Sequence, residues 1–221
     1  MCGKFLQPRF SQAQSWRDYH DLLDMVGREN GTDETVTPMR FARVIRLDAN
    51  GMRENVAMRW GFSALGSKTP SKPDHIHARS ETIDNKPTFR DAFRERRGIV
   101  VVKSFNESRE VRSRTVQHVV RPQDGKPLAI AVLWEAWEHP ARDKLLTFVM
   151  CTVPANALIS TITDRMPAVL APEDWAKWLG ETPASAAELK ALLRTVEGDW
   201  EMTPEKKTPP PKKPGPQGEM F

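Results

Sequence analysis

The chain begins Met1-Cys2-Gly3, and Cys2 becomes a pair of neighbouring nucleophiles once the initiator methionine is removed. We expect this removal because the Cys2 side chain is small. An α-amine has a pKa of about 7.7 to 8.0 against about 10.4 for lysine, so far more of it is neutral at pH 7. The amine can trap an aldehyde as a Schiff base, and the thiol can then close a thiazolidine ring. The alternative is that Cys2 is a small apolar residue packed into a sheet.

The segment 75–82 is dense in polar side chains. In an extended strand, His75, His77, Arg79 and Glu81 would point to one face, because side chains alternate along a strand. Two imidazoles and Glu81 could ligate a metal ion, but Arg79 would repel a cation from between the ligands. We therefore expect no metal site, and a solvated strand face is the other interpretation.

Arginines are concentrated between residues 79 and 97, and other basic residues lie in separate segments. Clustered guanidinium groups suit phosphate neutralisation, whereas an exposed helix also carries such charge for solubility. The basic residues are Arg79, Arg90, Arg94, Arg96 and Arg97, with Lys4, Arg109, Arg112 and Arg114 elsewhere.

Glu107 follows the apolar strand predicted over residues 98–102, so we expect it at a strand end. A carboxylate there could transfer protons if its surroundings raise its pKa, or it could pair with a nearby arginine. The residues alone leave both roles open.

The composition predicts one large domain. The chain has 221 residues, 39% of them apolar, with seven Trp and nine Phe. Cys2 and Cys151 lack CxxC or CxxH spacing, which argues against a zinc site or disulfide framework and fits a reducing cytoplasm. The sequence has no run of 18 apolar residues and no apolar signal core, so we expect neither export nor a membrane span. The net charge of +4 favours an anionic partner only weakly.

The last residues differ in composition from the rest. Residues 203–221 hold six of the 18 prolines and four lysines, too few apolar groups to fold. We expect a domain over residues 1–202 and a disordered tail over 203–221. The tail either assists anion binding or serves only as a solubilising extension.

The elements that must position these residues can be placed from periodicity. Apolar spacing predicts a helix over 11–26, and Asn50-Gly51 predicts a turn between strands over 42–47 and 55–60. Because hairpins dominate and no regular βαβ alternation appears, the fold class is α+β with mostly antiparallel pairing. The other expected elements are a helix near 88–96, strands at 99–103, 116–121, 128–134 and 145–152 with a turn at Asp124-Gly125, and helices near 172–179 and 184–196.

Five motifs occur in order over residues 1 to about 180, and together they resemble the SRAP family, the SOS response-associated peptidases or abasic-site-processing proteins. The motifs are Met1-Cys2-Gly3-Lys4-Phe5, Arg59-Trp60-Gly61-Phe62, Ala78-Arg79-Ser80-Glu81-Thr82, Phe105-Asn106-Glu107, and Asp164-Arg165-Met166-Pro167-Ala168-Val169-Leu170.

The resemblance implies a DNA damage-response protein that binds single-stranded DNA. It would capture the ring-opened aldehyde of an abasic site through Cys2 as a thiazolidine crosslink, without a cofactor or metal. Glu107 would assist proton transfer, and Lys4, Arg79, Arg90 and Arg165 would contact DNA. The implied fold is a twisted sheet closing toward a barrel with peripheral helices. We expect a monomer in the cytoplasm.

This chain departs from the family's usual residues near the implied site. His77 stands where the family usually has Asn, and Thr163 where it usually has His. We therefore hypothesise that His77 supplies the site imidazole and that Thr163 offers a hydroxyl. Ser108 replaces an aromatic residue and Thr35 replaces Asn, which bears on base stacking and DNA fit.

Two further functions stay open. Cys2, helped by Glu107 or His77, could cleave off Met1 in a peptidase-type reaction, and lyase activity could accompany capture. Alternatively, the protein is a non-catalytic module that binds single strands in a salt-sensitive manner without a covalent product.

Overall fold

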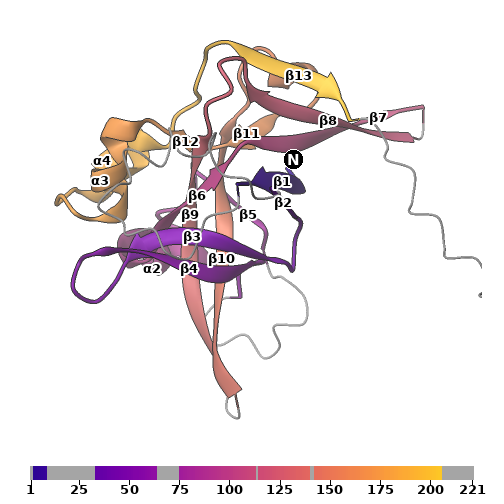
Figure 1. Cartoon of the computed structure of the whole chain (residues 1–221). Helices are drawn as coiled ribbons and strands as arrows, with labels where there is room; N and C mark the ends of the chain where they lie inside the picture. The colour runs from indigo at the N-terminus through magenta and orange to yellow at the C-terminus, as the bar shows by residue number, and fades with distance from the viewer. Residues whose placement is uncertain (1, 9–32, 64–74, 113, 140–141, 206–221) are drawn as a thin grey trace, which may run out of the picture.

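Strand pairing divides the described part of the chain into two sheets (Figure 1). The computed structural model describes residues 2–8, 33–63, 75–112, 114–139 and 142–205. Its strands are β1 (Lys4–Gln7), β2 (Glu34–Val36), β3 (Phe41–Leu47), β4 (Arg53–Trp60), β5 (His77–Arg79), β6 (Arg97–Val102), β7 (Ser104–Val111), β8 (Arg114–Pro122), β9 (Leu128–His139), β10 (Arg142–Pro154), β11 (Arg165–Pro167), β12 (Val169–Leu170) and β13 (Trp200–Pro204). The helices are α2 (Pro87–Glu95), α3 (Trp175–Leu179) and α4 (Ala186–Leu192), with short 3-10 turns η2 (Ile159–Thr161) and η3 (Pro172–Asp174).

The larger sheet closes on itself. Its order is β11-β10-β4-β3-β6-β9-β12, and β10 pairs with β9 as well as with β4, so five strands complete a ring. β10 pairs in parallel with β4, and also in parallel with β5, which lies outside this strand order. This arrangement confirms the α+β class, the mostly antiparallel pairing and the closure toward a barrel.

The smaller sheet carries the amino-terminal strand. It is antiparallel with the order β13-β8-β7-β1-β2. One row across it consists of Phe5, Phe105 and Val120, which have no exposed surface. This face of the sheet therefore packs into the hydrophobic core. Because side chains alternate between the two faces of a strand, the residues two positions further along each strand point to the same face.

The hairpin predicted around Asn50-Gly51 is confirmed. β3 and β4 pair from Phe41 opposite Arg59 to Leu47 opposite Arg53. The Asp48 carboxylate accepts hydrogen bonds from the Asn50 and Met52 amides, and Gly51 takes a φ of +75°. These contacts hold the turn.

Other sequence expectations need correction. A turn is present at Asp124-Gly125, but it joins β8 of the smaller sheet to β9 of the barrel, so the flanking strands form no hairpin. β13 continues through Pro204, so the boundary expected at residue 203 falls inside a paired strand. The helix expected over 11–26 and residues 206–221 lie outside the described residues.

The helices lie at the periphery of the sheets, as predicted (Figure 1). α2 begins at Pro87, whose fixed φ suits a first helical position, and it buries Phe89, Ala92 and Phe93. In α3, the Trp178 indole donates to the Gly98 carbonyl at 2.8 Å, which ties the helix to β6. In the part of the chain that the structure describes, no helix has the length and apolarity needed to cross a membrane.

Candidate active site

The pairing of β1 with β7 brings the beginning of the chain next to Glu107. Lys4 lies opposite Asn106 and Phe5 opposite Phe105, so continuing the register by one residue places Gly3 beside Glu107. Gly3 is exposed, and a Cβ built on it would meet no atom within 4 Å. The space above Gly3 is therefore open.

Cys2 itself is buried, with 1% of its surface exposed. Its thiol donates a hydrogen bond to the Lys4 carbonyl at 3.4 Å. Burial, with a smaller contribution from the Glu107 charge, raises the pKa of Cys2 to about 12. At neutral pH the sulfur is therefore a protonated thiol.

Glu107 lies in the middle of β7, which corrects the expectation of a strand end. It is two residues from Phe105 and shares its core-facing side, so only 1% of its surface is exposed. Burial raises the pKa of Glu107 to about 7, and a hydrogen bond with the Cys2 backbone partly opposes the rise. A carboxyl group with a pKa near 7 can both accept and donate protons at neutral pH.

His77 approaches Cys2 from the barrel. β5 runs parallel to β10 with His77 opposite Met150, and the Trp60 ring packs edge-on against the imidazole with centroids 6.1 Å apart. Burial lowers the pKa of His77 to about 4, although a hydrogen bond with the Cys2 backbone acts in the opposite direction. Its Nε2 atom is buried and has no hydrogen-bond partner among the described residues. The ring is therefore neutral at pH 7.

Thr163 lies in the connection between η2 and β11. Its backbone N–H donates to the Ile159 carbonyl at 3.1 Å, and its side chain is half-buried. The charge of the next residue, Asp164, contributes to the raised pKa of Glu107, so this connection approaches the carboxylate. Cys2, Glu107 and His77 thus interact directly, and Thr163 borders the group through its neighbour.

Two of the expected DNA contacts are engaged within the protein. Arg165 is 6% exposed, and its guanidinium forms a bidentate ion pair with Glu81 and donates to the Thr152 carbonyl at 2.7 Å. Lys4 is partly buried and pairs with the Glu205 carboxylate. In this arrangement a phosphate would have to compete with each of these carboxylates.

The other two expected contacts are exposed. Arg79 is the last residue of β5, two positions after His77, and is solvent-exposed. Arg90 lies on α2 and pairs with the adjacent Asp91 at 2.9 Å. Of the four residues, Arg79 is therefore the exposed cation that lies on the same strand as a candidate site residue, His77.

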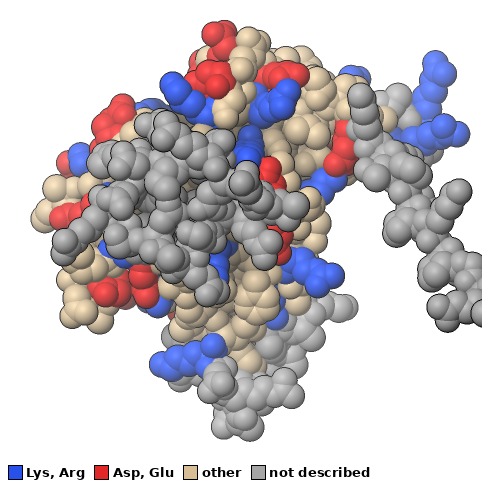
Figure 2. Space-filling view, viewed as in Figure 1, with Lys and Arg blue, Asp and Glu red and all other residues tan. Residues whose placement is uncertain are grey.

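The expected arginine cluster is largely used for structure. Arg96 pairs with Glu135 at 2.9 Å, and Arg97 donates to main-chain carbonyls of Phe93 and Trp178. Figure 2 correspondingly shows basic and acidic side chains interspersed on one face rather than one continuous basic patch. Besides Arg79, exposed arginines lie on β7, β8 and their connection: Arg109, Arg112 and Arg114.

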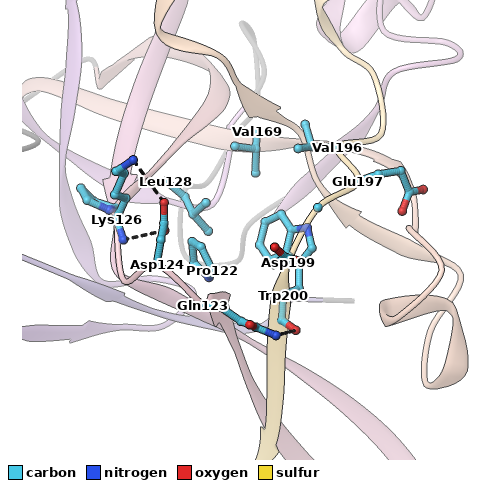
Figure 3. A pocket seen from close by; sticks show the side chains of 12 residues that line it. Pro122, Gln123, Asp124, Lys126, Leu128, Val169, Val196, Glu197, Asp199 and Trp200 are labelled. Atoms are coloured by element: carbon cyan, nitrogen blue, oxygen red, sulfur yellow. Dashed lines mark hydrogen bonds and ion pairs between the residues drawn. The ribbon is translucent and has the colours of Figure 1, made fainter.

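Metal ligation finds no support in the described ranges, which contain no group of three or more His, Cys, Asp or Glu side chains able to hold an ion. Figure 3 shows a separate hollow between the β8–β9 connection and the segment before β13. Asp124, Glu197, Asp199 and Trp200 line it, and none of the candidate site residues does. The candidate site residues therefore lie apart from this hollow.

Sequence reasoning missed two features of the site. One is the open space above Gly3, and the other is His118, which lies opposite Glu107 on β8. Both depend on strand register, and β7 itself was not among the expected strands. Phe105 and Val111 are the only apolar residues of β7, so its sequence has no alternating apolar pattern that could have revealed the strand.

Comparison with known proteins gives consistent matches. The family model described as SOS response associated peptidase (SRAP) matches residues 1–208. The chain is 31% identical over 208 residues to the abasic site processing protein YoqW of Bacillus subtilis, covering 90% of this chain and 89% of YoqW. It is 29% identical over 157 residues to the abasic site processing protein HMCES of Xenopus tropicalis, covering 59% of this chain and 47% of HMCES.

Solved structures match the fold. A crystal structure of a protein from Bordetella bronchiseptica has a TM-score of 0.73 at 20% identity, covering 93% of this chain and 100% of that one. A crystal structure of a protein from Bacteroides thetaiotaomicron has a TM-score of 0.69 at 22% identity, covering 78% and 77% of the two chains. At these identities the likeness concerns the fold alone.

The buried Glu107 carboxyl predicts a pH-dependent gain in stability for Glu107→Gln. The folded protein retains the Glu107 proton up to a pKa of about 7, against an ordinary 4.5, so wild-type stability falls as the pH rises through this window. Relative to wild type, the variant should gain up to about 3 kcal/mol between pH 4.5 and 7. Urea unfolding at several pH values measures this difference.

His77 contributes in the opposite direction between about pH 4 and 6.5, but it is present in both proteins and cancels from the difference. A stability difference between wild type and Glu107→Gln that stays constant from pH 4.5 to 8 would contradict the raised Glu107 pKa.

Proposed function

This chain belongs to the SRAP family, and from that premise we propose that it processes abasic sites in single-stranded DNA by forming a covalent crosslink through Cys2 after loss of Met1. Relatives such as YoqW carry the name abasic site processing protein. The observation that supports the assignment most is that the strand register carries the first residues alongside buried Glu107, and that the Cys2 backbone affects the pKa of both Glu107 and His77, which come from two different sheets.

Glu107 is suited to the proton transfers of imine formation. In the processed protein the Cys2 nitrogen is an α-ammonium, and the Glu107 carboxylate accepts one of its protons. The neutral amine attacks the aldehyde carbon of the ring-opened sugar to give a carbinolamine. Glu107 then protonates the departing hydroxyl group, and water leaves as an iminium joins nitrogen to the sugar carbon. The Glu107 carboxylate takes the remaining proton from this nitrogen, which gives the neutral imine. A pKa of about 7 allows both directions of transfer at neutral pH.

The protonation state of the Cys2 thiol sets the order in which the two bonds to the sugar carbon form. Because the pKa of Cys2 is raised to about 12, the sulfur is protonated and the nitrogen reacts first. The S–H group then adds across the imine: sulfur bonds to the carbon, and its proton passes to the nitrogen. The product is a thiazolidine. The same raised pKa disfavours a thiolate-dependent cleavage of Met1, so we do not propose the peptidase alternative.

His77 has a positioning role in this proposal. Its hydrogen bond with the Cys2 backbone holds the first residue against β5, and its buried Nε2 atom is available to an oxygen of the sugar. Arg79 follows on the same strand and is exposed, which suits contact with a phosphate beside the lesion. The open space above Gly3 gives the sugar a route to the Cys2 nitrogen.

The proposed reaction predicts which adducts with abasic-site DNA form when Cys2 is substituted. The wild-type protein without Met1, incubated with single-stranded DNA carrying one abasic site, should give an adduct that survives denaturation. Cys2→Ser keeps the amine but lacks the thiol, so its imine should survive only when trapped with borohydride. Denaturing gel electrophoresis and intact mass measure both products.

Cys151→Ala is the matched control, because Cys151 is buried in β10 and takes no part in the chemistry. This variant should crosslink like wild type. A denaturation-resistant adduct of Cys2→Ala without borohydride would exclude the proposed linkage.

The role of His77 predicts a graded effect of two substitutions. His77→Ala removes the hydrogen bond to the Cys2 backbone and should slow adduct formation by about tenfold or more. His77→Asn restores a donor of similar reach and should recover most of the rate. Single-turnover crosslinking kinetics distinguish the two, and equal wild-type rates for both variants would rule out the role.

Arg79 predicts a change in the salt dependence of DNA binding. Loss of one phosphate contact on single-stranded DNA should reduce the slope of log K against log salt by about 0.7 for Arg79→Gln. Fluorescence anisotropy with undamaged DNA measures the slope. Arg121→Gln is the control, since Arg121 pairs with Glu201 on the far side of β8 from β7. An unchanged slope for Arg79→Gln would remove Arg79 from the interface.

A further inference from the structure

A second imidazole lies next to Glu107 on the smaller sheet. The β7–β8 register places His118 directly opposite Glu107. Residues that face each other in an antiparallel pair point to the same side, with Cβ atoms about 4.5 to 5.5 Å apart. The neighbouring row on this side is Phe105 and Val120, both fully buried. His118 therefore borders the carboxylate on the core-facing side of the sheet.

His118 reaches from the core toward solvent. The side chain as a whole is half-buried, whereas its Nδ1 atom is buried and has no hydrogen-bond partner within the described ranges. On its other flank the β13 register places Pro204, which brings no polar side chain. Glu205 follows Pro204, and its carboxylate pairs with Lys4 of β1. Glu107 is thus the ionisable group that faces His118 across the strands.

The proposed capture reaction needs a path for one proton. The Cys2 ammonium, its thiol and the sugar aldehyde become a neutral thiazolidine, one water and one proton. Glu107 accepts that proton, but only 1% of its surface is exposed, so direct transfer to water is restricted. Imidazole can accept a proton at one nitrogen and release another from the second, which makes it a common proton relay.

We propose that His118 is a positioning residue for proton exit: it takes the proton that Glu107 receives from the iminium nitrogen after water has left, and passes it to solvent. This inference rests on the proposed function and adds a residue to it. The transfer runs from the Glu107 carboxyl to Nδ1, and the proton on the other nitrogen leaves to water or buffer. The carboxylate is then restored, and no bond other than those to hydrogen changes.

The test is chemical rescue of His118→Gln. Single-turnover crosslinking is measured in dilute buffer, with and without added imidazole, for wild type, His118→Gln and His75→Gln. His75 packs against Phe89 with ring centroids 5.1 Å apart, outside the smaller sheet, and its variant is the control for loss of an imidazole. Without imidazole, His118→Gln should be slower by about tenfold, less than the hundredfold or more expected for losing a direct proton donor. Added imidazole should restore most of its rate and leave the other two proteins unchanged.

Each remaining outcome counts against the relay. If His118→Gln reacts at the wild-type rate in dilute buffer, His118 carries no proton. If it is slow and imidazole does not accelerate it, the residue serves packing only, which thermal unfolding would show as a lowered Tm. If the wild-type protein itself forms no adduct, the proposed function fails and this inference fails with it.

Discussion

The short pairing of β1 with β7 is the constraint on which the site depends. Three register pairs, from Lys4 opposite Asn106 to Leu6 opposite Ser104, connect the first residues to the strand that carries Glu107. A slip of one residue would turn every side chain of β1 to the other face of the sheet. The buried contact of Phe5 with Phe105 opposes such a slip. The same apolar packing that stabilises the sheet therefore also holds the Cys2 nitrogen beside Glu107.

Burial explains most of the electrostatics of the site. Desolvation is the largest cause of the raised pKa values of Cys2 and Glu107 and of the lowered pKa of His77. Each shift favours the neutral form of its side chain, so the site near pH 7 contains a thiol, a carboxyl group poised between its two forms and a neutral imidazole. Keeping Glu107 buried lowers stability at neutral pH, a trade-off typical of functional sites.

Local sequence signals revealed those parts of the fold that depend on local geometry. Asn50-Gly51 predicted the β3–β4 hairpin because its turn needs a residue with positive φ, and the helix expected near 88–96 is present as α2. The turn at Asp124-Gly125 was also found, but sequence could not show that it links two different sheets. Which distant strands pair depends on packing across the whole core, so a short stretch of sequence says little about it.

The sequence predicted which residues form the candidate site better than it predicted how their side chains are arranged. Resemblance to the SRAP motifs singled out Cys2, Glu107 and His77, and in the structure the Cys2 backbone affects the pKa of both other residues. The sequence could not show that Arg165 forms an ion pair with Glu81, because the two residues lie far apart in the chain. Nor could it show His118, whose position follows only from the β7–β8 register.

The central claim is that the core holds the Glu107 carboxyl neutral up to about pH 7 beside the Cys2 nitrogen. Carbon-13 NMR of side-chain carboxyl groups, with Glu107→Gln used to assign the signal, measures this titration directly in the protein that retains Met1. The account predicts a midpoint near pH 7. A midpoint at the ordinary value of 4.5 would contradict it.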